Sequence, residues 1–242
     1  MSTRIFLFAL FTAVLATEAL ADGTPQWQAS SPVQQVHVLE LYTSQSCSSC
    51  PPADQWLLDV ANTYPGFQTV IPLAFHVTYW DYLGWQNEFG QKVFDQRQRM
   101  LARRANTGVY TPGMFLNGDE WRQWRRGQPL PVADEVGRLS FSGDREGQTR
   151  FEFTPLQKLK DKLLLHTAFL TSGARTKVNR GENRGRTLQE GYIVRTHRVF
   201  ELGCDESCSF DASLTPPGDA DALVAWVTTR SGDHVQAAGA FF

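Results

Sequence analysis

Two cysteines with two residues between them, Cys47 and Cys50, have the type and spacing best suited to chemistry in this chain. Such a pair can close a small disulfide ring. At the start of a helix, unpaired N–H groups and the helix dipole stabilise a thiolate and lower the pKa of its thiol. That thiolate attacks a disulfide, and the second thiol resolves the mixed disulfide that forms. The spacing therefore predicts Cys47 as nucleophile and Cys50 as resolving cysteine; a passive structural disulfide is the alternative.

The pattern around the pair predicts the strand and the helix that would position it. Residues 36–42 (VHVLELY) are rich in β-branched and apolar residues, and apolar side chains recur at helical spacing over 53–64. Pro51 and Pro52 suit the first turn of that helix, where a missing N–H costs little. Three further elements follow: a buried strand over 70–77, a helix over 88–105 and a short strand with an Asn-Gly turn over 110–118. This alternation is typical of an α/β domain.

The second half of the chain shows a different pattern, with little helical periodicity. Apolar or alternating runs separated by glycine-containing turns predict strands over 149–153, 162–171, 191–202, 222–227 and 234–241. A series of strands of this kind is typical of a β-sandwich. We therefore predict an α/β domain followed by a β-rich, sandwich-like module, with the arginine- and proline-containing segment 122–134 as the hinge.

The first 21 residues have the features of a cleaved export signal. Arg4 is basic, residues 5–16 are almost wholly apolar, and residues 19–21 (ALA) form a small-x-small cleavage site. The apolar run is too short to span a bilayer as a helix, which needs roughly 20 residues. We expect cleavage after Ala21, a flexible lead-in over 22–35 and a periplasmic or secreted protein; an uncleaved amphipathic N-terminus is the alternative. Cysteines in such an oxidising compartment can stay paired.

Composition excludes several classes of protein. The chain has 242 residues, of which 42% are hydrophobic and 20% are charged, so it is too apolar for a disordered protein. A formal net charge of −2 argues against a dedicated nucleic-acid or membrane-surface protein. Four cysteines are too few for a disulfide scaffold. We therefore expect no nucleic-acid partner, and no membrane partner once the signal has been removed.

Four segments of the sequence resemble a bacterial family of predicted secreted, thioredoxin-like proteins that is catalogued as a domain of unknown function. They are ELYTSQSCSSCPPAD at 40–54, HVTYWDYLGW at 76–85, YTPGMFLNG at 110–118 and RGENRGRTL at 180–188. The resemblance covers residues 36–203. It implies a thioredoxin-like fold and an exported location, but it implies no substrate. Together with the strand pattern of the second half, it leads us to expect a thioredoxin-like domain over residues 36–135 and the β-rich module over 140–242.

The resemblance also implies a role for Thr111 and Pro112. In thioredoxin-like folds a cis-proline lies against the two cysteines, and the residue before it binds the substrate backbone. We therefore expect a cis Thr111–Pro112 bond; an ordinary trans proline at a strand edge is the alternative. Thioredoxins carry Gly-Pro between their cysteines, whereas two serines stand here. The proline after Cys50 is also expected to push that cysteine away from helical dihedrals.

His76 and Trp80 are further candidates for binding substrate. His76 could be a base near the thiols or a ligand for a soft metal ion, and a hydrogen-bonded core histidine is the alternative. Trp80, together with Tyr79, Tyr82 and Trp85, could line a groove for peptide substrates or fill the core.

A second pair of cysteines, Cys204 and Cys208, lies in a predicted turn between later strands. We expect two local disulfides, Cys47–Cys50 and Cys204–Cys208. One alternative makes the second pair an electron-transfer partner of the first, and another builds a zinc site from all four cysteines. Four cysteines permit three pairings, and the sequence does not choose among them.

These observations predict an exported thiol–disulfide oxidoreductase that acts through Cys47 and Cys50 on protein thiols or disulfides. Its partners would be exported proteins and a redox partner protein, and the chemistry needs no cofactor. One alternative is a periplasmic copper-binding protein or chaperone that holds Cu(I) between the two thiolates, with or without His76. Another is a non-catalytic secreted interaction module whose disulfides are structural. The sequence predicts neither the direction of the redox reaction nor the oligomeric state.

Overall fold

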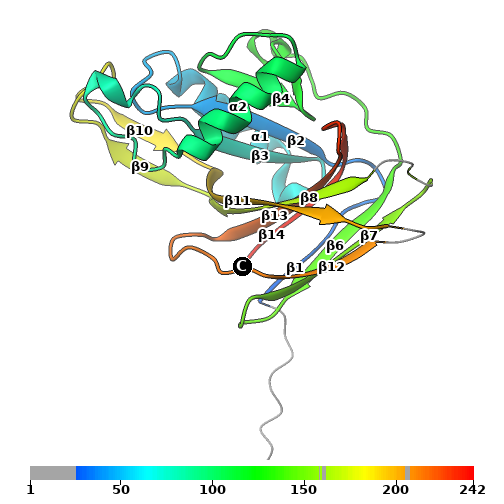
Figure 1. Cartoon of the computed structure of the whole chain (residues 1–242). Coiled ribbons are helices and arrows are strands. Elements are labelled where there is room, and N and C mark those ends of the chain that lie inside the picture. Colours follow the sequence, from blue (N-terminus) through cyan, green and yellow to red (C-terminus); the bar gives the residue numbers. More distant parts are fainter. Residues whose placement is uncertain (1–25, 158, 160–161, 205–207) are drawn as a thin grey trace, which may run out of the picture.

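A computed structural model describes residues 26–157, 159, 162–204 and 208–242 of the chain. The described residues form mainly β-strands, arranged in an eight-stranded sheet, a four-stranded sheet and a two-stranded ribbon, together with two α-helices (Figure 1). Within this part of the chain, no helix combines the length and the apolar character needed to cross a membrane. The predicted signal peptide over residues 1–21 lies outside the described residues.

The eight-stranded sheet runs from edge to edge through β14 (His234–Phe241), β13 (Ala222–Thr229), β8 (Leu163–Thr171), β11 (Ile193–Leu202), β3 (Val70–His76), β2 (His37–Thr43), β4 (Gly113–Leu116) and β5 (Asp119–Glu120). The four-stranded sheet contains β1 (Trp27–Ser30), β6 (Gly137–Gly143), β7 (Gln148–Pro155) and β12 (Cys208–Ser213). The ribbon pairs β9 (Ala174–Lys177) with β10 (Thr187–Glu190). The helices are α1 (Pro51–Thr63) and α2 (Lys92–Arg104), and short 3₁₀ turns cover Pro65–Phe67, Asp81–Leu83 and Gln123–Arg126.

Helix α1 connects β2 to β3, which run parallel to each other with Leu41 opposite Ala74. A parallel pair needs a crossover of this kind. Helix α1 covers one face of the pair and α2 the other (Figure 1), which explains why every residue of both strands is buried. Leu57 of α1 belongs to the apolar cluster on the first face, and Phe94 of α2 packs edge-on against Phe75 on the second.

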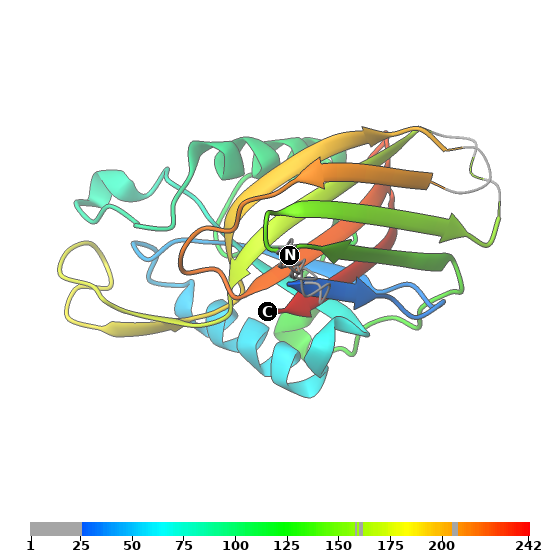
Figure 2. The ribbon, with the colours of Figure 1, turned by 90° about the horizontal axis from the view of Figure 1, so that it is seen from below.

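The four-stranded sheet packs against β8, β11, β13 and β14 of the eight-stranded sheet, on the face opposite to α2 (Figure 2). Strands β6 and β7 alternate buried and exposed residues, as expected for an antiparallel sheet with one face on the core and one in solvent. Their buried aromatic side chains, such as Phe141 and Phe151, share one apolar cluster with Phe169 of β8 and Leu223 of β13. This cluster joins the two sheets.

The predicted fold, an α/β thioredoxin-like domain followed by a separate sandwich-like module, is wrong. The described residues are mainly β-sheet, and β2 to β5 from the first half share one sheet with β8, β11, β13 and β14 from the second. The halves join where Ile193 of β11 pairs in parallel with Ala74 of β3. Local periodicity identifies each strand but carries no information about a partner so distant in the chain. The boundaries at residues 36, 135 and 140 stay predictions.

Candidate functional site

The Cys47–Cys50 pair is a disulfide between the end of β2 and the start of α1, with 5.4 Å between its Cα atoms. Cys50 is the N-cap of α1 and has helical dihedrals (φ −78°, ψ −38°), so the expected departure from helical geometry is wrong. The reason is local hydrogen bonding. The Cys50 carbonyl accepts the N–H groups of Ala53 (2.8 Å) and Asp54 (3.1 Å), and the Cys50 N–H donates to the Cys47 carbonyl (3.2 Å). These bonds outweigh the steric preference that a following proline imposes.

The start of α1 offers the Cys47 sulfur a helix dipole but few N–H donors. Pro51 and Pro52 occupy the first helical positions and have no N–H group, and the next two N–H groups donate to the Cys50 carbonyl. The Ser49 hydroxyl lies 3.4 Å from the Cys47 Sγ atom instead. A hydroxyl in this position can donate to a thiolate, which would stabilise the charged form and lower the pKa of the Cys47 thiol.

Access to the disulfide is from the side of the loop that carries Ser48 and Ser49. Both serines are exposed, whereas Cys47 is 3% exposed and Cys50 is fully buried. Both cysteines are therefore buried, and the small exposed part of the disulfide belongs to Cys47. This order matches the roles of nucleophile and resolving cysteine that the sequence predicts.

The segment between β9 and β10 holds the backbone of the cysteine loop. The buried Asn183 side chain donates from its amide nitrogen to the carbonyls of Gln45 (3.0 Å) and Cys47 (2.9 Å). The Glu182 carboxylate accepts the Ser48 N–H (2.9 Å), and this bond lowers the pKa of Glu182. All three bonds reach backbone atoms of the loop, so they hold its path directly. Sequence reasoning missed Asn183 and Glu182 as parts of the site.

The segment after β3 contacts the same loop from another side. The Trp85 indole N–H donates to the side-chain oxygen of Gln45 (2.9 Å), and the Ser46 hydroxyl donates to the Trp85 carbonyl (3.0 Å). Gln45 is fully buried and is therefore held both by its side chain and by its carbonyl. This double attachment fixes the residue two positions before Cys47.

The Thr111–Pro112 pair lies near the same end of β2. Its peptide bond is cis, which confirms the prediction. Strand β4 begins directly after it, with Gly113 opposite Tyr42. The Trp80 indole N–H donates to the Thr111 hydroxyl (2.7 Å). The four sequence segments 40–54, 76–85, 110–118 and 180–188 therefore meet at one end of β2.

His76, the last residue of β3, is fully buried. Its Nδ1 atom lies 3.0 Å from the Asn87 amide nitrogen and accepts its proton, and the Glu190 carboxylate is 3.9 Å away. Burial lowers the pKa of His76 to about 3, so the ring is neutral near pH 7. These contacts are those of a hydrogen-bonded core histidine; roles as base, metal ligand or substrate contact stay predictions. Among the described residues, no three His, Cys, Asp or Glu side chains are grouped to hold a metal ion.

Two buried carboxyl groups near the loop were not anticipated from the sequence. Asp54 lies one helical turn after Cys50, and Glu190 is the last residue of β10. Burial, and then the Glu190 charge, raise the pKa of Asp54 to about 8, and burial raises the pKa of Glu190 to about 7. The Gln45 amide donates to the Glu190 carboxylate (2.9 Å) and so links it to the loop. The signal for Asp54 was its spacing, since residues four apart share one helix face.

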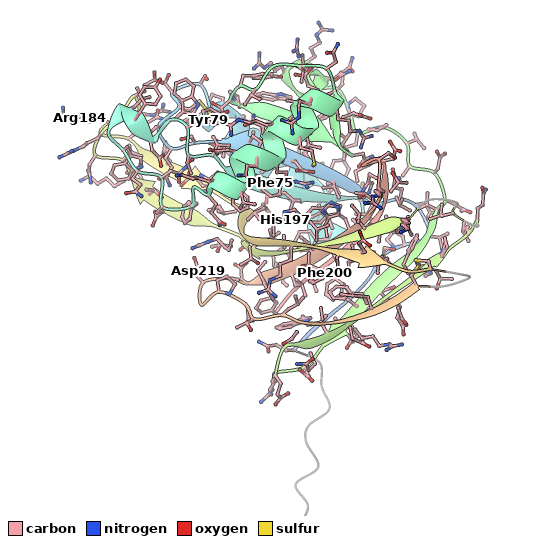
Figure 3. The ribbon with its side chains drawn as sticks, viewed as in Figure 1. Phe75, Tyr79, Arg184, His197, Phe200 and Asp219 are labelled. Atoms are coloured by element: carbon pink, nitrogen blue, oxygen red, sulfur yellow. A yellow bond between two sulfur atoms is a disulfide. The ribbon has the colours of Figure 1, made fainter. Side chains whose placement is uncertain are left out.

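An open hollow of about 620 Å³ lies beside the β9–β10 segment and is lined by Leu83, Asn179, Arg180, Gly181, Glu182 and Arg184. Glu182 bonds the Ser48 N–H, so the hollow opens next to the exposed side of the cysteine loop. Arg184 lies at the end of the molecule that carries the β9–β10 ribbon (Figure 3). A partner that docks at the disulfide would therefore meet arginine side chains.

Cys204 and Cys208 form the second disulfide, with 4.6 Å between their Cα atoms, which confirms the predicted local pairing. Cys208 begins β12, lies opposite Phe153 of β7 and belongs to the apolar cluster between the two sheets. Electron transfer between the two cysteine pairs stays a prediction.

The family described as Protein of unknown function (DUF1223) matches residues 38–228 of the chain. The chain belongs to this family. The matched range contains all four segments that meet at the end of β2. The prediction that the chain belongs to an uncharacterised family is therefore confirmed. None of the curated proteins matches the chain.

Among solved structures, this DUF1223 chain is similar to a protein from Agrobacterium tumefaciens that was determined by a structural genomics consortium. The identity is 24% over 86% of this chain and 95% of that chain, with a TM-score of 0.64. It is also similar to HBP35 of Porphyromonas gingivalis, with 13% identity over 88% of this chain and 76% of that chain and a TM-score of 0.57. At these sequence identities, the structural similarity shows only that the chains share a fold.

Proposed function

We propose that this DUF1223 chain is an exported thiol–disulfide oxidoreductase whose reactive group is the Cys47–Cys50 pair. The observation that carries the proposal is the position of the disulfide: it lies at the start of α1, in a loop that hydrogen bonds from two other segments hold in place. The Ser49 hydroxyl beside the Cys47 sulfur supports it further, because a hydrogen-bond donor stabilises a thiolate. The pairing of all four cysteines fits an oxidising compartment.

The reaction exchanges two electrons between the pair and a substrate. In the reducing direction the Cys47 thiolate attacks one sulfur of a substrate disulfide; that S–S bond breaks, a mixed disulfide forms and the leaving thiolate takes up a proton. The Cys50 thiolate then attacks the Cys47 sulfur, which closes the Cys47–Cys50 disulfide and releases the second substrate thiol. The protein loses two electrons and the substrate gains them. The reverse sequence oxidises a substrate dithiol, and the reduction potential of the pair sets the direction.

The residues around the pair take distinct roles in this proposal. Thr111 and Pro112 would bind the backbone of the substrate, and Trp80 would position them through its bond to the Thr111 hydroxyl. Asn183 would act as a positioning residue, since it holds the carbonyl of Cys47. His76 has no exposed surface, so a part in substrate binding would require the site to open.

A redox titration tests the proposal, and the second disulfide serves as its internal control. The mature protein would be equilibrated in glutathione buffers, alkylated and analysed by mass spectrometry at each cysteine. We expect Cys47–Cys50 to titrate between about −120 and −270 mV and Cys204–Cys208 to stay oxidised below about −300 mV. If Cys47–Cys50 also stays oxidised below about −300 mV, the disulfide is structural and the proposal fails.

A further inference from the structure

A pocket of about 550 Å³ lies between α2 and the eight-stranded sheet. We propose that it binds a small, uncharged, planar aromatic molecule that carries one N–H or O–H donor. Its volume falls within the roughly 300–1,000 Å³ typical of small-molecule sites. None of residues 44–50 lines it, so this inference does not depend on the proposed redox function.

Apolar side chains from both sides form the walls and the mouth of the pocket. Helix α2 contributes Val93 and Met100, and β11 contributes Val199. These three side chains are 47%, 47% and 46% exposed, which is unusual for large apolar residues. A ligand that covered them would gain the free energy of removing this apolar surface from water.

Three aromatic rings on neighbouring strands, stacked on one another, line the pocket, and the Arg97 guanidinium lies 5.5 Å from the centroid of the Trp226 ring. His166 of β8, His197 of β11 and Trp226 of β13 have ring planes within 7–9° of parallel and centroids 4.9–5.4 Å apart. His197 lies on the side of the sheet that faces α2, whereas Phe200, three residues later, lies on the opposite side (Figure 3). Aromatic rings pack best against other flat rings, which favours a planar aromatic ligand over an aliphatic one.

Two of the three arginines that line the pocket are each paired with a carboxylate. Arg97 donates two hydrogen bonds of 2.7 Å to the Glu40 carboxylate, so its charge is already paired. Burial lowers the pKa of both His166 and His197 well below its usual range, which leaves these rings neutral. At the rim, Arg104 pairs with Asp233 (2.6 Å), and Arg230 is exposed to solvent. An ionised ligand would lose its hydration inside the pocket, where the Arg97 and Arg104 charges are already paired and only the exposed Arg230 is not, which favours an uncharged one.

Two residues of the lining, His234 and Arg104, each carry one buried side-chain atom that lacks a hydrogen-bond partner among the described residues: Nδ1 of His234 and Nη1 of Arg104. The His234 Nε2 atom lies 2.7 Å from the Val36 carbonyl, which can only accept, so Nε2 carries the proton and Nδ1 is an acceptor. Nδ1 is buried and has no hydrogen-bond partner among the described residues. Burial lowers the pKa of His234 to about 4, so Nδ1 remains an acceptor near pH 7. An unpaired buried acceptor costs free energy, and a ligand donor that reached Nδ1 would recover that cost.

The test compares two fluorescent probes that share one aromatic skeleton. N-phenyl-1-naphthylamine is uncharged, planar in its ring system and carries an N–H donor; 8-anilino-1-naphthalenesulfonate adds a sulfonate charge. We expect saturable binding of the uncharged probe to the purified full-length mature protein, and binding of the sulfonate at least about tenfold weaker, a difference of about 1.4 kcal/mol. Absence of saturable binding by the uncharged probe, or tighter binding of the sulfonate, would overturn the proposal.

Matched variants test whether the uncharged probe binds in this pocket. Val93→Trp adds bulk at the mouth from an exposed position and should weaken binding of the uncharged probe about tenfold. Arg103→Trp makes the same addition to an exposed position of α2 outside the pocket and should leave binding unchanged. If Val93→Trp lowers thermal stability, Val199→Trp on the opposite wall decides instead. Equal binding by the pocket variants and the control would place the probe elsewhere. Cys47→Ser should leave binding unchanged, which separates this test from that of the redox site.

Discussion

The two disulfides of this chain close rings of similar size in contrasting surroundings. Cys47 and Cys50 lie before a helix, in a loop whose backbone is held by hydrogen bonds from the β9–β10 segment. Cys204 and Cys208 lie before a strand, and Cys208 packs in the apolar cluster between the two sheets. In the chain-entropy view, a ring this short stabilises the folded state by about 2 kcal/mol in either place. Ring closure alone therefore gives no reason for the two disulfides to have different surroundings.

The polarity of the surroundings distinguishes the two disulfides. Near the first disulfide, Gln45 donates to Glu190 (2.9 Å) and to Thr176 (3.0 Å), and all three side chains are buried. Burying polar groups costs free energy even when most of them are paired. A structural staple gains nothing from such a network, whereas a site that must hold a loop and handle protons does. The contrast supports a chemical role for Cys47–Cys50 and a structural role for Cys204–Cys208.

Replacing Cys47, the proposed nucleophile, should have the largest effect on the contrast between the two disulfides. Cys47→Ser removes the sulfur proposed to attack, so the fast exchange of the reduced protein with glutathione disulfide should disappear. Cys204→Ser opens the other ring; it should leave the exchange rate unchanged and lower the free energy of unfolding by about 2 kcal/mol. Stopped-flow mixing with mass spectrometry measures the first quantity, and urea unfolding measures the second. Loss of fast exchange in both variants, or in neither, would contradict the division of roles.

The elements next to the cysteines were predictable because their signals are local. Helical spacing of apolar residues and two prolines identify α1, and runs of β-branched residues identify β2 and β3. The cis Thr111–Pro112 bond followed from the resemblance to a family rather than from any spacing.

Contacts between distant segments were not predictable in the same way. Asn183 bonds the Cys47 carbonyl across 136 positions of the chain, and Ile193 pairs with Ala74 to extend the sheet beyond β3. A glycine-flanked arginine segment such as 180–188 is typical of an exposed charged hairpin, and nothing in its composition marks the one buried amide within it. The fold prediction failed at the same point: each strand was visible, but the sheet to which it belongs is decided by pairing over long distances.

Buried Asp54, which lies close to the Cys47–Cys50 disulfide, should make the free energy of unfolding depend on pH. Between an unfolded pKa of about 4 and a folded pKa of about 8, the folded state holds a proton that the unfolded state has released. The free energy of unfolding should therefore fall as the pH rises from about 4 to about 8 and change little above that range. Asp54→Asn removes one of two buried carboxyl groups with a raised pKa, the other being Glu190, so it should reduce this fall and stabilise the protein at pH 8 by roughly 2–4 kcal/mol.

Urea unfolding at pH 5 and pH 8 measures the effect of Asp54→Asn. Asp59→Asn is the matched control, because Asp59 lies on the same helix but is exposed, and it should leave the pH dependence unchanged. Wild type and Asp54→Asn losing the same amount of stability between the two pH values would show that the Asp54 carboxyl is ionised in the folded protein.

The smallest expected effect concerns the Ser49 hydroxyl. Ser49→Ala removes the donor 3.4 Å from the Cys47 sulfur and should raise the pKa of the Cys47 thiol by about one unit, whereas Ser48→Ala should leave it unchanged. The rate of alkylation of the reduced protein by iodoacetamide, measured against pH, gives both pKa values. If the two variants titrate alike, the hydroxyl does not stabilise the thiolate. The dipole of α1 would then be its main support, because Pro51 and Pro52 leave the first turn without N–H groups to offer.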